Sequence, residues 1–287
     1  MTCQARDRSC RWQDDVLPST YRCSPFLRSF AVLLRRTIVS ALAVFGLAVT
    51  GSAPAHAITG GEAASLDTAP YMVSIQAQGW SGSFRHICGG FLRGPHKVVT
   101  AAHCLDGQTS AKLRVAWGGT NRSSLPNKSA VSAIKIHPSY DAASLRNDVG
   151  VLTLATAASE NNGVRYAKLA TSDPAPGQSL TLAGWGHAAP DTTALPEGLQ
   201  AARMPVTTSE TCATDYSTPL TPFDTTGRFC AGPADGSKAI CRGDAGGPAI
   251  LNGTVVGVIS GGRGCGLPDS PAILSSTAHF NAWLSSQ

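Results

Sequence analysis

The chain has 287 residues, of which 43% are hydrophobic and 14% are charged, and this length suits one or two globular domains with a substantial core. The formal net charge is +5, but residues 1–57 hold seven Arg and three Asp, a net +4. Residues 58–287 hold sixteen Lys or Arg and fifteen Asp or Glu, a net +1. Such a near-neutral chain gives no reason to expect nucleic acid or an anionic membrane as a partner.

Residues 1–57 are expected to be a leader that ends in a signal peptide. Arg35 and Arg36 precede the apolar run Ile38–Val49, and Ala55-His56-Ala57 forms a small-x-small cleavage site. A membrane anchor is the alternative, but the run is shorter than the ~20 residues needed to span a bilayer. We therefore expect a secreted, extracellular protein with no membrane attachment after cleavage.

Short runs rich in Val, Ile and Leu recur along residues 58–287 and are interrupted by Gly, Pro, Asn and Asp, a pattern typical of an all-β fold. The clearest runs are Tyr71–Ile75, Lys97–Thr100, Val149–Leu154, Ser179–Ala183 and Thr254–Ser260. The Pro/Gly-rich segment 171–177 predicts a connector between two halves, 58–170 and 171–287.

The last dozen residues depart from the strand pattern. Ser276 or Thr277 is expected to cap a short helix that buries Phe280, Trp283 and Leu284.

Two segments end or begin a predicted strand with a residue suited to acid–base chemistry. His103 follows Val98–Ala102, and histidine is the side chain that titrates near neutral pH without perturbation. Asp148 precedes an apolar strand, where an aspartate is ordinarily a turn residue. A third segment, 241–248, reads Cys-Arg-Gly-Asp-Ala-Gly-Gly-Pro.

Thr-Ala-Ala-His-Cys at 100–104, Asn-Asp-Val-Gly-Val-Leu at 147–152 and Gly-Asp-Ala-Gly-Gly-Pro at 243–248 together resemble the chymotrypsin/trypsin family of serine proteases. The resemblance covers essentially all of residues 58–287. It implies two six-stranded antiparallel Greek-key barrels with a short C-terminal helix. The order His103, Asp148, position 245 matches this family rather than the subtilisin or α/β-hydrolase order.

The resemblance implies a role for each motif residue. His103 would act as general base and Asp148 would orient its ring. The amides of Gly243 and Ala245 would form the oxyanion hole, and His86 would be at most a supporting residue. Ala245, however, stands where the family has its nucleophilic serine.

The family-like sequence Ile-Thr-Gly-Gly begins at Ile58, immediately after the expected cleavage site. In the family the new terminal ammonium pairs with the Asp that precedes the nucleophile, which here is Asp244. We therefore predict that the mature protein begins at Ile58. N-terminal sequencing of the secreted protein tests this, and a start several residues earlier would contradict it and require a separate activating protease.

The resemblance also implies a specificity pocket. Its floor would be Ala239 and its walls Gly262 and Ala272, while Ser260 would pack on Asp148. An uncharged floor cannot offset the desolvation of a buried guanidinium, so we expect a polypeptide partner that places an apolar residue there. Arg242 lies beside the mouth and is interpreted first as a solvated arginine; Asp269 is an alternative acidic group.

Six of the nine cysteines remain after the leader, which indicates disulfides in an exported chain but allows 15 pairings. The resemblance implies Cys88–Cys104, Cys212–Cys230 and Cys241–Cys265. No CxxC pair favours zinc. The segment Leu113–Tyr140, where the family has its calcium loop, contains no acidic residue. We expect no metal and no cofactor.

The sequence therefore predicts a serine endopeptidase homologue that hydrolyses peptides very poorly, because alanine has no Oγ. The alternative is a natural pseudoprotease that binds peptides or proteins. Ala245 is compatible with natural loss, deliberate replacement or a sequence error. Beyond a polypeptide substrate or ligand, a protein inhibitor is a candidate partner, and a monomer is expected.

Overall fold

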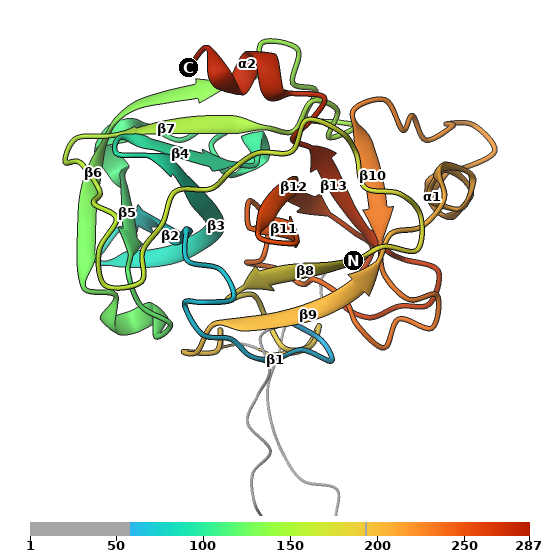
Figure 1. Cartoon of the computed structure of the whole chain (residues 1–287), viewed down its shortest axis with the longest axis horizontal. Coiled ribbons are helices and arrows are strands. Elements are labelled where there is room, and N and C mark those ends of the chain that lie inside the picture. The colour runs from blue at the N-terminus through green and yellow to red at the C-terminus, as the bar shows by residue number, and fades with distance from the viewer. Residues whose placement is uncertain (1–57, 193) are drawn as a thin grey trace, which may run out of the picture. The chain divides into compact units, whose positions relative to one another are not determined.

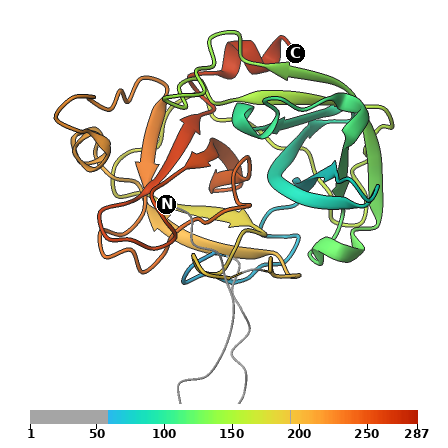
Figure 2. The same cartoon turned by 180° about the vertical axis from the view of Figure 1, so that it is seen from behind.

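Strands make up most of the regular structure in residues 58–192 and 194–287, the part of the chain that the computed structural model describes. The leader, its apolar run and the expected cleavage site fall outside these residues. Two sheets lie side by side in the region 58–287 (Figures 1 and 2). Among the described residues, none of the helices is both long enough and apolar enough to cross a membrane.

The first sheet is a closed six-stranded antiparallel barrel in the order β2-β3-β4-β7-β6-β5. In β6, exposed Lys128 and Ala130 alternate with buried Ser129 and Val131, as expected for a strand with one face toward a core. The six strands are β2 (Met72–Gln78), β3 (Phe84–Gly94), β4 (Lys97–Thr100), β5 (Leu113–Trp117), β6 (Asn127–Ile136) and β7 (Gly150–Leu154).

The second sheet has seven strands in the order β1-β9-β8-β11-β12-β13-β10. The end of β9 also reaches the edge strand β10, where Thr207 N donates to Cys230 O at 2.9 Å and Gly232 N donates to Pro205 O at 2.9 Å. The strands are β1 (Glu62–Ala63), β8 (Ser179–Gly184), β9 (Gln200–Pro205), β10 (Arg228–Ala231), β11 (Pro248–Leu251), β12 (Thr254–Gly261) and β13 (Ala272–Ser276). The all-β, two-sheet prediction is confirmed; the second sheet is nearly closed and gains the short strand β1.

Each end of the described chain packs on the half to which it is not connected in sequence. Strand β1 pairs with β9, and Ile58 is fully buried in the core of the second sheet, although the sequence division placed residues 58–63 with the first barrel. Conversely, helix α2 (Asn281–Ser285) packs on the first barrel, where Arg93 Nη1 donates to Leu284 O at 2.9 Å. Figure 1 shows β1 beside β9 and α2 beside the first barrel.

The C-terminal helix begins later than the sequence predicts. Ser276 ends β13 and Thr277 follows it, while the N-cap position of α2 is Phe280, which makes no side-chain cap. Phe280 and Leu284 are buried as expected, and Trp283 is partly buried.

The remaining helices are short. They are α1 (Ser209–Tyr216) and three 3₁₀ turns, η1 (Ala102–Cys104), η2 (Ser110–Lys112) and η3 (Arg122–Ser124).

Candidate active site

His103 and Asp148 come together because β4 and β7 are paired neighbours. The pairing of Thr100 with Gly150 brings η1, which carries His103, close to Asp148, which lies two residues before β7. His103 Nδ1–H donates to Asp148 Oδ2 at 2.8 Å, and the backbone N–H of His103 donates to Asp148 Oδ1 at 2.8 Å. One carboxylate oxygen therefore holds the ring and the other holds the backbone of the same residue, with Nε2 left on the opposite side of the ring.

Asp148 is fully buried and further fixed by two serines of the second sheet. Ser260 Oγ donates to Asp148 Oδ2 at 2.6 Å, and Ser275 Oγ donates to the Asp148 carbonyl at 2.9 Å. Ser260 was expected here from the sequence, whereas Ser275 was not. The neighbouring Asn147 has a left-handed backbone with φ 52° and is tied by its side-chain amide to Ser139 O at 2.7 Å.

The loop around position 245 has a backbone that only glycine accommodates easily. Gly243 has φ +98° and Gly246 has φ +80°, and a Cβ on Gly246 would lie 2.1 Å from Thr100 Oγ1. Three amides of this loop are paired: Asp244 N with Cys241 O, Gly246 N with Ile259 O, and Gly247 N with Asp244 O. The amides of Gly243 and Ala245 have no acceptor among the described residues.

His86 holds this loop from behind. Its Nε2–H donates to Gly243 O at 2.9 Å, which leaves Nδ1 to accept from the Ser74 hydroxyl at 2.8 Å. Burial lowers the His86 pKa to about 4, so the ring is neutral at pH 7, as this arrangement requires. The contact fixes the Gly243 carbonyl and thereby the plane of the following peptide.

Asp244 is a fully buried carboxyl that contacts only backbone donors among the described residues. Gly186 N donates to Oδ1 and Cys241 N donates to Oδ2, both at 2.8 Å. Burial raises the Asp244 pKa to about 7, and the two hydrogen bonds oppose that shift without cancelling it. In the described part of the chain, no basic side chain forms a salt bridge with it.

A cavity of about 640 Å³ opens between His103 and the 241–245 loop. Its wall includes Ala245, Gly243, Ser260, Gly262 and the Cys241–Cys265 disulfide. Arg242 is also part of the wall, and no acidic side chain is found among the described residues that line it.

Two predicted pocket residues do not line this cavity. Ala239 is 7% exposed and Ala272 is 2% exposed, and Ala239 instead pairs with Thr59 in a β-bridge. Ile240, which the sequence analysis did not consider, lines the cavity, and its Cδ1 lies 3.9 Å from the position that a Cβ on Gly262 would take. The alternative acid Asp269 is not part of the wall either.

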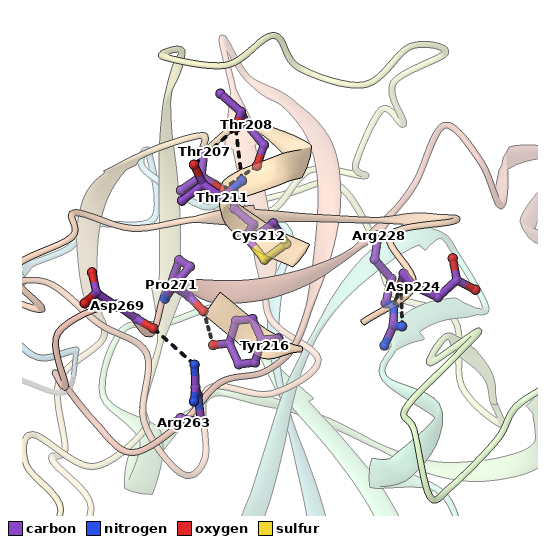
Figure 3. The surroundings of a disulfide bond; sticks show 11 residues. Thr207, Thr208, Thr211, Cys212, Tyr216, Asp224, Arg228, Arg263, Asp269 and Pro271 are labelled. Atoms are coloured by element: carbon purple, nitrogen blue, oxygen red, sulfur yellow. Dashed lines mark hydrogen bonds between the residues drawn. A yellow bond between two sulfur atoms is a disulfide. The ribbon is translucent and has the colours of Figure 1, made fainter. Parts of the chain in front are cut away.

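Near Gly262, aromatic and arginine side chains join α1 to the loop before β13 (Figure 3). The Tyr216 hydroxyl at the end of α1 donates to Pro271 O. Arg263 lies over the Tyr216 ring at 4.9 Å and donates to Asp269 O at 3.3 Å. The Cys212–Cys230 disulfide fastens α1 to β10, so the wall beyond Gly262 is anchored to the second sheet.

The structure has all three disulfides that the resemblance implied: Cys88–Cys104, Cys212–Cys230 and Cys241–Cys265. Cys88, His103 and Cys104 form the one grouping among the described residues whose spacing could suit a metal ion. The two sulfurs are bonded to each other and cannot act as thiolate ligands.

Replacing Cys241 and Cys265 together with Ser is expected to lower the free energy of unfolding by roughly 2–5 kcal/mol and to weaken peptide binding, because this disulfide forms part of the cavity wall. Denaturant titration and peptide affinity measure the two effects. The matched control is the Cys212→Ser, Cys230→Ser pair, which should lose similar stability with a smaller loss of affinity. Equal affinity losses in both variants would contradict the assignment.

Comparison with known proteins gives a consistent result. The model of the Trypsin family matches residues 58–284. Trypsin alpha of Drosophila melanogaster is 32% identical over 227 residues, which cover 79% of this chain and 86% of that protein. Trypsin theta of Drosophila erecta is 36% identical over 229 residues, covering 79% and 84%, and Serine protease 1 of Homo sapiens is 33% identical over 230 residues, covering 79% and 87%.

Proposed function

Because the chain belongs to the trypsin family of serine proteases, we propose that it is a secreted member that binds polypeptides but hydrolyses them very poorly. One observation carries the proposal. His103, which is held by Asp148, lines one cavity together with Gly243 and Ala245, whose amides have no acceptor among the described residues. The side chain at position 245, however, is a methyl group.

The proposed roles follow from this geometry. A peptide carbonyl in the cavity would place its oxygen against the amides of Gly243 and Ala245. His103 would take the proton of an attacking hydroxyl, and Asp148 would hold the ring in the tautomer that allows this. Since Ala245 has no hydroxyl, the first bond to the carbonyl carbon does not form, and only stabilisation of a slow attack by water remains.

We further propose that the protein is cut after Ala57 and that the new ammonium of Ile58 neutralises Asp244. The support is a fully buried carboxyl without a basic side-chain partner among the described residues, together with an Ile58 side chain already buried in the second sheet. Breaking one side of such a pair typically costs ~3–5 kcal/mol. We also propose that the chain after the cut consists of two halves, residues 58–170 and residues 171–287.

A natural pseudoprotease that acts as a binding module is the second candidate. The open cavity favours it, because the unpaired donors can still hold a peptide or a protein inhibitor without any reaction. Turnover of a peptide ester by the protein and by its Ala245→Ser variant separates the two. Restored turnover supports a recently silenced protease, whereas tight binding with an inert variant supports the module.

The cavity is expected to prefer apolar residues. If the Ala245→Ser variant is active, it should cleave after Leu, Met or Phe in preference to Lys or Arg, because Ile240 and the disulfide offer no anion to a buried cation. Comparison of kcat/KM on peptides that differ only at this residue tests the prediction. Preference for Lys or Arg would mean that an acidic group is reached that the described cavity wall lacks.

A further inference from the structure

We propose that the cavity binds the free carboxyl terminus of a polypeptide whose last residue is apolar. The inference rests on the proposed function, that this cleft binds polypeptides, and it names the ligand. The carboxylate would lie at position 245, with one oxygen on the two unpaired amides and the other toward His103.

The first support is a pair of amide donors held in place. Gly243 and Ala245 both line the cavity, and neither N–H has an acceptor among the described residues. The loop cannot turn them away easily, because the carbonyls of the same two peptide units are held: His187 N donates to Arg242 O at 2.8 Å, and Gly247 N donates to Asp244 O at 3.0 Å. Fixed, desolvated donors of this kind favour an anionic oxygen over a neutral one.

The second support is the position of His103. Its Nδ1–H donates to Asp148. In the described chain, the hydrogen-bond contact of Nε2 is with Cys104 Sγ at 3.7 Å, a distance too long for a strong hydrogen bond. Nε2 therefore faces the cavity without a strong partner, and in the imidazolium form of the ring it donates one N–H there. A carboxylate has two oxygens and can accept from the amides and from this ring at once, whereas an amide terminus has one acceptor oxygen.

The third support is Ala245 itself. A serine hydroxyl here would stand between His103 and the two amides and would occupy the space of the second carboxylate oxygen. A methyl group neither donates nor accepts a hydrogen bond, so it does not compete with a carboxylate for the amides or for His103. Ala245, which removes hydrolysis, thus makes the site more suitable for the carboxylate of a free peptide terminus.

The charge and shape of the remaining wall agree with this ligand. Arg242 adds a cation at the wall, and the described wall has no acidic side chain to repel a carboxylate. Ile240 and the Cys241–Cys265 disulfide offer apolar surface to the last side chain. Residues 260–262, at and just after the end of β12, also line the cavity. Backbone pairing on the β11 side of β12 reaches Ile259, which leaves the edge beyond it open to a peptide strand.

Isothermal titration calorimetry on the mature protein tests the proposal with three peptides. These are acetyl-Ala-Ala-Ala-Leu as the free acid, the same peptide as its C-terminal amide, and acetyl-Ala-Ala-Ala-Glu amide, which carries only a side-chain carboxylate. The free acid is expected to bind about 10- to 100-fold more tightly than either amide, the range expected of charge-assisted hydrogen bonds. Arg242→Ala should weaken the acid a few-fold and leave the Leu amide unchanged.

Two variants make the test specific. Arg203→Ala removes one exposed cation on β9 that does not line the cavity, and it should leave the preference unchanged. Ala245→Ser should weaken binding of the free acid, which has no bond after Leu to cleave, by about tenfold, and an unchanged affinity for the acid in this variant would overturn the role given to the methyl group.

The other outcomes separate this inference from the proposed function. Equal binding of acid and Leu amide would overturn carboxyl-terminus recognition while the proposed polypeptide-binding function survives. Binding of the Glu amide as tight as that of the acid would show that the site reads any carboxylate, which also overturns it. If no peptide binds to folded protein and the Ala245→Ser variant is inert, both proposals fail.

Discussion

Ala245→Ser should raise kcat for an apolar peptide ester by several orders of magnitude. Removal of the nucleophile from a triad typically lowers kcat by roughly 10⁶-fold, or about 8 kcal/mol at ~1.36 kcal/mol per tenfold. The substitution adds one oxygen to a site whose other parts are in place: His103 and Asp148 are joined at 2.8 Å, and the two amides are unpaired among the described residues. Most of the lost rate should therefore return, as measured by steady-state turnover.

The control for this experiment is the double variant Ala245→Ser, His103→Ala, in which the gain should disappear because no base accepts the hydroxyl proton. A folded but inert Ala245→Ser protein would show that the site has changed beyond its missing hydroxyl and would favour the binding module. Rapid, inhibitor-sensitive turnover by the unmodified protein would show that Ala245 does not occupy the nucleophile position.

The parts of the site that sequence could predict are those carried by local motifs. His103 and Asp148 each lie at the end of a strand, and strands β4 and β7 are neighbours, so the strand pattern and the motif order together place the two residues. The expected all-β class depended on the same strand pattern. The conformation of the 243–246 loop followed from its glycines, two of which have positive φ.

What the sequence could not predict depends on contacts between distant segments. Ser275 lies 127 residues from Asp148, and the bond between them joins β13 of the second sheet to the segment that leads into the first barrel's β7. The exchange of terminal segments between the halves has the same origin. In the pocket, counting residues located Ala239, which is bridged to the distant Thr59, whereas its neighbour Ile240 lines the cavity.

In the Ala245→Ser background, Asp148→Asn should lower kcat by about 10⁴-fold, the size typical for loss of the triad aspartate. Asp148 accepts from both the backbone and Nδ1 of His103 and from Ser260. An asparagine side chain that turns its NH₂ group toward Nδ1 makes that nitrogen the acceptor, so the proton moves to Nε2. The ring then has no free lone pair for the Ser hydroxyl, and the steady-state rate measures this loss.

Asp141→Asn is the matched control, because Asp141 is an exposed aspartate in the same connection whose carboxylate accepts from the backbone amides of Ala143 and Ser144. It carries the same change of charge but has no contact with His103, so kcat should change by less than about threefold. Thermal melting establishes that both variants fold. A loss of less than tenfold in folded Asp148→Asn would mean that this carboxylate does not set the tautomer of His103. A large loss in both variants would assign the effect to net charge rather than to the tautomer of His103.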